Sequence, residues 1–68
     1  MDKDIIMDAI LQERHRQDGL HEWNKKTNRL AVLMEEVGEV AQALQGDGDL
    51  AEELVHLASV CVRWLEEL

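Results

Sequence analysis

The 68-residue sequence has no proline, phenylalanine or tyrosine, only four glycines and a single cysteine. One cysteine excludes an intrachain disulfide and any zinc site built from several cysteines. So few turn formers and aromatic residues argue against a sandwich or barrel of β-strands, and a hydrophobic fraction of 46% argues against a disordered tail. The length allows one domain, residues 1–68, with a marginal core. Chains this short are usually reinforced by a metal or by a partner chain.

Basic residues are also scarce, since seven Lys and Arg stand against fifteen Asp and Glu, for a net charge of −8. A general attraction to nucleic acid polymers or anionic membranes is therefore not expected. No apolar run approaches the roughly 20 residues that span a bilayer, and the acidic N-terminus lacks the form of a signal peptide. We therefore expect no membrane association and a cytoplasmic location.

The first 28 residues are predicted to form a helix and a loop. Apolar residues recur at helical spacing over residues 4–17, and Gly19 ends the run. Residues 19–28 lack this periodicity and are predicted to form a loop around Trp23.

Two further helices are predicted in the rest of the chain. One covers residues 29–45 and stops at Gly46. The spacing of Asp49 and Glu52 is that of a capping box at the start of the other, which we expect to continue to the C-terminus. Each carries an apolar stripe expected to form the core: Leu30, Leu33, Met34, Val37, Ala41 and Leu44, then Leu50, Leu54, Leu57, Cys61, Leu65 and Leu68. The predicted fold class is all-α, with three helices.

Apolar residues also lie outside these stripes, and this favours self-association. They are Val32, Val40 and Ala43 on the second helix and Val55, Val60, Val62 and Trp64 on the third. Helices that are apolar over so much of their circumference are usually covered on both sides. We therefore expect the three-helix chain to form an antiparallel helical bundle completed by oligomerisation, as a homodimer or homotetramer. Val40, Val60 and Trp64 are among the expected intermolecular contacts.

Four polar side chains carry the candidate chemistry. Glu36 and Glu39 lie about 60° apart on one flank of the second helix, and Glu53 and His56 share a flank of the third. If these flanks face each other, the four side chains converge, and a divalent cation would offset the repulsion and lost hydration of the carboxylates. The alternative is a solvated charged face, as on most glutamate-rich helices.

The spacing of these residues resembles a known motif. The pattern EExxE, a gap and then ExxD is the signature of the all-α nucleoside triphosphate pyrophosphohydrolases, the MazG-like superfamily. Here it is EEVGE at residues 35–39, a gap of 13 residues, and ELVH at residues 53–56. The segments ERHRQDGLHEW, LAVLMEEVGEVAQAL and ELVHLASVCVRWLE are also similar to helices of short, phage- or mobile-element-type members. The resemblance covers nearly the whole chain.

The resemblance implies metal-dependent hydrolysis of a nucleoside or deoxynucleoside triphosphate to the monophosphate and pyrophosphate, with Mg²⁺, or else Mn²⁺, as cofactor. It implies that Glu36, Glu39 and Glu53 bind the metal and that Glu35 orients or deprotonates the attacking water. Phosphoribosyl-ATP pyrophosphohydrolases, with a similar frame, are a related alternative. A non-catalytic helical oligomerisation or regulatory module that keeps the family fold is an alternative of another class.

His56 stands where the family motif has Asp. Imidazole is a poor ligand for Mg²⁺ but a good one for Mn²⁺ and Zn²⁺. His56 is therefore a candidate ligand of a softer metal, a candidate catalytic hydrogen-bond donor to a phosphate or to metal-bound water, or the mark of a weakened site. An ordinary, partly buried helix residue is a further alternative.

The first helix and the loop are candidates for the rest of a nucleotide site. The candidate substrate-binding residues are Arg14, Gln17, Trp23, Lys25 and Lys26. A base would stack on Trp23, and the cations would bind phosphates. The alternative is that Trp23 closes the open end of the bundle while the basic residues balance nearby acids.

Overall fold

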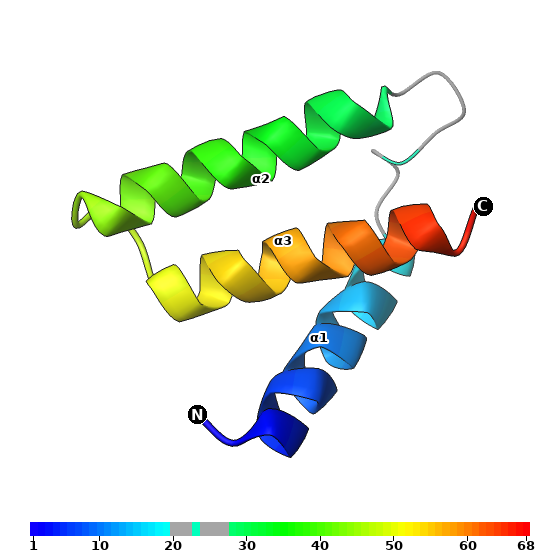
Figure 1. Ribbon diagram of the computed structural model, residues 1–68, viewed down its shortest axis with the longest axis horizontal. Coiled ribbons are helices and arrows are strands. Elements are labelled where there is room, and N and C mark those ends of the chain that lie inside the picture. Colours follow the sequence, from blue (N-terminus) through cyan, green and yellow to red (C-terminus); the bar gives the residue numbers. More distant parts are fainter. Residues whose placement is uncertain (20–22, 24–27) are drawn as a thin grey trace.

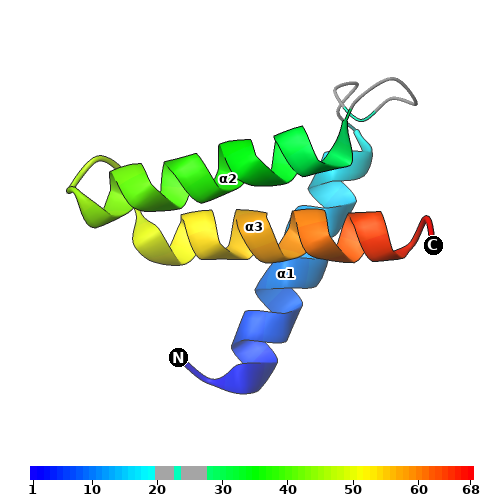
Figure 2. The ribbon, with the colours of Figure 1, turned by 45° about the horizontal axis from the view of Figure 1, so that its top comes forward.

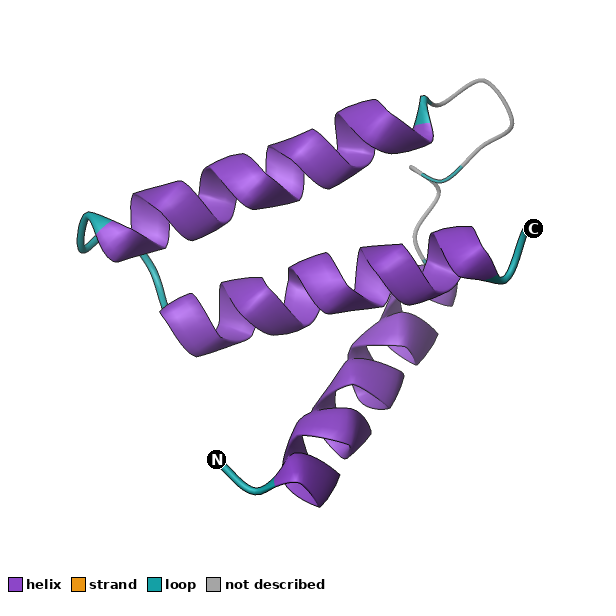
Figure 3. Cartoon of the chain, in the orientation of Figure 1, coloured by secondary structure: helices purple, strands orange, loops and turns teal. Residues whose placement is uncertain are grey.

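A computed structural model describes residues 1–19, 23 and 28–68 of the chain. Within these residues it contains no strand and three helices, α1 (Lys3–Asp18), α2 (Arg29–Leu44) and α3 (Leu50–Leu65). Helices α2 and α3 lie side by side as an antiparallel hairpin, and α1 crosses α3 steeply (Figure 1, Figure 2). Figure 3 shows the same three helices and the short connection between α2 and α3. The predicted all-α class and the three helices are confirmed.

A polar side chain caps the start of each helix. The capping carboxylate or amide oxygens belong to Asp2, Asn28 and Asp49, which accept hydrogen bonds from the backbone N–H groups of Asp4, Leu30 and Glu52. Such caps satisfy amides that have no partner within the helix. The predicted start of the third helix after Asp49 is confirmed. Its predicted extension to the C-terminus is wrong, because the α-helix ends at Leu65 and the last residues form tighter turns.

The connection between α2 and α3 depends on two glycines. Gly46 and Gly48 have φ angles of 91° and 125°, in the left-handed region that other residues rarely adopt. The N–H of Gly46 bonds to the carbonyl of Ala43 and closes the end of α2. The predicted stop at Gly46 is therefore confirmed, and the chain reverses over a few residues into an antiparallel hairpin.

The core does not form where the leucine stripes predict it. Seven apolar side chains of these stripes are between 37% and 68% exposed: Leu30, Met34, Val37, Leu44, Leu50, Leu54 and Leu65. The buried apolar residues are Ala43 and Val60, which lie outside the stripes. Periodicity shows that a helix face is apolar, but it does not show what covers that face. The prediction that the stripes form the core within the chain is therefore wrong.

Ser59 marks the place where α1 packs on α3. Its side chain is fully buried, and its hydroxyl donates to the carbonyl of Val55 at 2.7 Å and lies 3.2 Å from the carbonyl of Ile10 on α1. A small residue at this position lets the two helices approach closely. Val60, the next residue, is 3% exposed within this single chain. Its predicted role as an intermolecular contact is therefore wrong.

We call these seven exposed residues of the two stripes the leucine face: Leu30, Met34, Val37 and Leu44 on α2, and Leu50, Leu54 and Leu65 on α3. At about 100° per residue, both stripes are rotated in the same sense from the line where α2 and α3 touch. In an antiparallel pair, this rotation places them on the same side of the hairpin, opposite α1. No helix among the described residues is long and apolar enough to cross a bilayer.

Candidate metal centre

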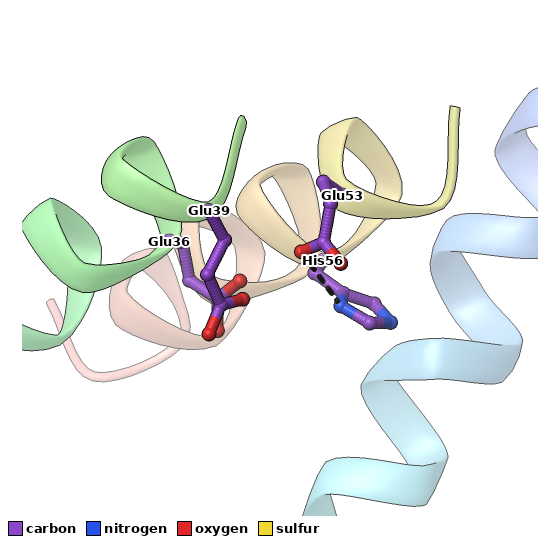
Figure 4. Close-up of side chains that lie close together, drawn as sticks. All are labelled: Glu36, Glu39, Glu53 and His56. Carbon is purple, nitrogen blue, oxygen red and sulfur yellow. Dashed lines mark ion pairs between the residues drawn. The ribbon is translucent and has the colours of Figure 1, made fainter. Parts of the chain in front are cut away.

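The four side chains expected to converge meet on the α1 side of the hairpin. Glu36 and Glu39 extend from α2, and Glu53 and His56 extend from α3 (Figure 4). Each pair is spaced i, i+3, so both of its members lie on one face of their helix. One ligand atom from each of the four residues lies within 4.8 Å of the others. Ligands of a single cation with bonds of about 2.1 Å lie roughly 3–4 Å apart, so small side-chain movements would close the set around an ion.

Two carboxylate oxygens of this cluster have no hydrogen-bond partner among the described residues. The Oε2 atoms of Glu36 and Glu53 are buried and accept no hydrogen bond from the described part of the chain. Burial, together with the neighbouring Glu39, raises the pKa of Glu36 to about 7. Burial and Glu39 raise the pKa of Glu53 as well. Because a buried, unpaired carboxylate is costly, these two oxygen atoms fit the role of metal ligands.

The His56 ring lies between carboxylates on two sides. Its Nδ1 is 3.5 Å from Oε2 of Glu53, and its Nε2 is 3.8 Å from Oε1 of Glu13 and 3.9 Å from Oε1 of Glu52. These are distances of ion pairs and not of hydrogen bonds. In Figure 4, the far edge of the ring points toward α1, the helix that carries Glu13. The cluster therefore has a third helix beside it.

Glu13 is a member of this site that the motif does not identify. Its side chain is 10% exposed and accepts two hydrogen bonds from Arg16, at 2.7 and 2.8 Å. These bonds lower the pKa of Glu13, so its carboxylate is ionised and fixed in place. The sequence contains one indication that Glu13 faces the site. Glu13 follows Ile6 and Ile10 on the face of α1 that packs against α3.

A cavity of about 250 Å³ opens beside the cluster. Its polar lining comes from all three helices: Glu13, Arg16, Gln17, Glu35, Glu36, His56 and Arg63. Gln17 is 7% exposed, and its Oε1 accepts no hydrogen bond from the described residues. Arg63 was not among the predicted residues, although its position two helical turns after His56 places it on the same face of α3. The cavity thus joins cationic, amide and carboxylate groups.

The predicted residues Glu35 and Arg14 lie in different surroundings. Glu35 lines the cavity but lies outside the four-residue cluster. Arg14 instead donates two hydrogen bonds to Glu66, at 2.8 and 2.9 Å, and one to Asp18 at 2.6 Å. Arg14 therefore ties α1 to the C-terminal end of α3, away from the cluster.

Trp23 is held by charged groups at the ends of α2 and α3. The guanidinium carbons of Arg29 and Arg63 lie 4.2 and 4.7 Å from the centroid of its ring. Its indole N–H donates to Glu67 at 2.8 Å. This is the arrangement expected if Trp23 closes the end of the bundle, because guanidinium groups already contact the ring on which a base would stack. The predicted phosphate-binding residues at positions 25 and 26, both lysines, lie outside the described residues.

The motif positions are thus assembled on two facing helices, with His56 in the place of the motif Asp. The third helix adds Glu13, Arg16 and Gln17 to the surroundings. Comparisons with protein-family models, with curated proteins and with solved structures found no match for this chain.

Proposed function

We propose that this chain is a divalent-metal-dependent nucleoside triphosphate pyrophosphohydrolase, which converts a nucleoside triphosphate and water into the monophosphate and pyrophosphate. The main support is the convergence of ligand atoms from Glu36, Glu39, Glu53 and His56 within 4.8 Å. The reaction itself is taken from the motif resemblance to the MazG-like superfamily. A bound Mg²⁺ or Mn²⁺ would bind phosphate oxygens, neutralise their charge and help to activate water.

The residues around the cluster have complementary roles in this proposal. Arg63 and Arg16 line the adjoining cavity and offset the repulsion between a polyanionic substrate and a chain of charge −8. Glu35, at the same cavity, orients or deprotonates the attacking water. The unpartnered Oε1 of Gln17 accepts a hydrogen bond from an N–H group of the substrate. At about 250 Å³, the cavity is smaller than most small-molecule sites, so it takes part of the nucleotide while the phosphates extend over the cluster.

We also propose that the active form is a homo-oligomer assembled through the leucine face. Within the described residues, the buried apolar core consists of Ala43 and Val60 alone. Such a core is small even for a short chain. Two parallel apolar stripes on an antiparallel hairpin are the surface that a second hairpin covers in a four-helix bundle. A second copy of this chain would therefore supply the burial that one copy lacks.

The leucine face also supports the alternative function, a non-catalytic oligomerisation or regulatory module. Such a module needs the apolar face and the frame but no turnover. The two functions differ in whether the carboxylate cluster is required for any chemistry.

Phosphorus NMR of reaction products tests the proposed function. The chain is incubated with canonical and modified NTPs and dNTPs and with Mg²⁺ or Mn²⁺. We expect nucleoside monophosphate and pyrophosphate, a loss of turnover of at least about 100-fold in Glu36→Gln and Glu53→Gln, and unchanged turnover in Asp47→Asn, an exposed carboxylate of the α2–α3 connection. Release of orthophosphate in place of pyrophosphate would contradict the proposed reaction. Turnover by wild type no greater than by Glu36→Gln would contradict the proposal and favour the non-catalytic module.

A further inference from the structure

We propose that His56 binds the cation through Nδ1, that Glu13 holds the ring in this orientation, and that the site therefore selects a divalent transition metal such as Mn²⁺ or Co²⁺ over Mg²⁺ and Ca²⁺. The inference rests on the proposed function, because it requires a cation at the cluster. It concerns the one position at which this chain departs from the family motif.

The two ring nitrogens of His56 face different groups, and only Nδ1 faces the cluster. A neutral imidazole carries one N–H and one lone pair, and a carboxylate only accepts hydrogen bonds. Glu13 and Glu52 both face Nε2, at 3.8 and 3.9 Å. Nδ1 faces Oε2 of Glu53 and the cluster, at 3.5 Å. When Nδ1 binds a cation there, the ring proton is on Nε2, on the side of Glu13 and Glu52.

The unpartnered oxygen of Glu53 supports the same assignment. Oε2 of Glu53 lies 3.5 Å from Nδ1 and yet accepts no hydrogen bond from it or from any other described group. A cation between the two atoms would be bound by both, and Oε2 of Glu36 is a second buried oxygen without a partner in the same cluster.

Glu13 is the positioning residue in this arrangement. Its side chain is nine-tenths buried, and two hydrogen bonds from Arg16 fix its carboxylate. A closure of about 1 Å would turn its contact with Nε2 of His56 into a hydrogen bond. A metal-bound histidine whose other N–H is donated to a carboxylate is held in one tautomer and becomes a stronger ligand.

The resulting donor set is three carboxylates and one imidazole. Mg²⁺ and Ca²⁺ prefer oxygen ligands, whereas Mn²⁺, Co²⁺ and Zn²⁺ accept an imidazole nitrogen. With Asp at position 56, as in the family motif, all four ligands would be oxygens. His56 therefore moves the preference of this site toward the transition metals.

Calorimetric titration of the whole chain with Mg²⁺, Ca²⁺, Mn²⁺ and Co²⁺ tests the inference through the ratio of the dissociation constants for Mg²⁺ and for each transition metal. We expect His56→Asp and His56→Asn to lower this ratio by at least about tenfold, with Asp also strengthening Mg²⁺ binding. Glu13→Gln should weaken Mn²⁺ and Co²⁺ binding by about 10- to 100-fold. His15→Asn, which changes an exposed histidine on α1, is the matched control and should leave the ratio unchanged.

Nitrogen NMR of the imidazole rings adds a structural readout. On addition of Zn²⁺, which is diamagnetic, the Nδ1 signal of His56 should shift while Nε2 keeps its proton, and the signals of His15 should not move.

If cations bind but the ratio of dissociation constants is the same in wild type, His56→Asn and His56→Asp, the inference is overturned while the metal site of the proposed function stands. If no cation binds to wild type, both are overturned. Circular dichroism verifies the fold, and His56→Asn decides the outcome if the extra charge of Asp unfolds the chain.

Discussion

At the residue scale, Glu36 is the carboxylate whose charged form is most disfavoured by its surroundings. Its pKa is raised to about 7 from an ordinary value near 4.5, first by burial and then by Glu39. Between these two pH values, the folded chain binds more protons than the unfolded chain. The contribution of Glu36 to the free energy of unfolding therefore falls as the pH rises from about 4.5 to about 7.

We predict that Glu36→Gln removes much of this pH dependence when a chelator is present. Because the amide carries no charge to desolvate, the variant should be more stable than wild type by roughly 1 kcal/mol at pH 7.5, less than the full linkage value because the carboxyl group is partly solvated. Part of the slope should remain, since the pKa of Glu53 is raised too. Urea denaturation at pH 5, 6, 7 and 8 measures both slopes.

Carboxylates that pair with arginine do not mask this effect. Arginine hydrogen bonds lower the pKa values of Glu13, Glu66 and Glu67. Their contribution to stability is present above their unfolded pKa and is lost only as the pH falls below about 4.5. Equal slopes for wild type and Glu36→Gln between pH 5 and pH 7 would therefore contradict the raised pKa of Glu36.

At the element scale, local signals predicted the helices well, and the faces poorly. As expected, α2 ends before Gly46 and α3 begins after Asp49. Caps and left-handed turns could be predicted because they depend on neighbouring residues only. Which face of α2 meets α3 depends on how the two helices pack together, and the periodicity of one helix does not show this. The motif did not predict Glu13 as part of the site for the same reason. Its position beside His56 depends on how the helices pack.

We predict that the size of Ser59 controls the contact between α1 and α3. Ser59→Leu would force a larger side chain into a fully buried position and should lower the free energy of unfolding by about 1–3 kcal/mol. Ser59→Ala removes only the hydroxyl, which bonds mainly within α3, and should cost less than about 1 kcal/mol. Urea denaturation compares the two. A larger loss for Ala than for Leu would show that the hydroxyl, and not the close approach, holds α1.

Arg14 allows a test that separates structure from substrate binding. Its hydrogen bonds with Glu66 and Asp18 connect α1 with the end of α3. Because Glu66 and Asp18 are half exposed or more, we predict that Arg14→Gln lowers the free energy of unfolding by about 0.5–1 kcal/mol, and by less at high salt. The KM for nucleotide should not change. If Arg14→Gln raised the KM and left the stability unchanged, Arg14 would instead be a substrate-binding residue.

At the scale of the whole molecule, the hairpin has two unlike sides. One carries the carboxylate cluster and is partly covered by α1, and the other is the leucine face. The sequence showed that both kinds of surface exist. It did not show that they lie on opposite sides, because that depends on how α2 and α3 are rotated against each other.

We predict that the leucine face drives self-association. Wild type should sediment as a dimer or larger species at micromolar concentration, and Met34→Lys or Leu54→Lys should shift it to monomer by placing a charge in an apolar contact. Gln42→Lys adds the same charge to α2 on an exposed position away from this face and should leave the assembly intact. A folded, monodisperse wild-type monomer would contradict the prediction.

The central claim is that Glu36, Glu39, Glu53 and His56 hold one divalent cation, and thermal unfolding with and without metal tests it most directly. Wild type should gain stability with Mg²⁺ or Mn²⁺ by mass action, by about 2.7 kcal/mol when the free metal is 100 times its Kd. Glu36→Gln should be the more stable protein in chelator and the less stable one in saturating metal, because it relieves the repulsion and loses the ligand. An unfolding temperature that does not change up to millimolar metal, in wild type and Glu36→Gln alike, would contradict the claim.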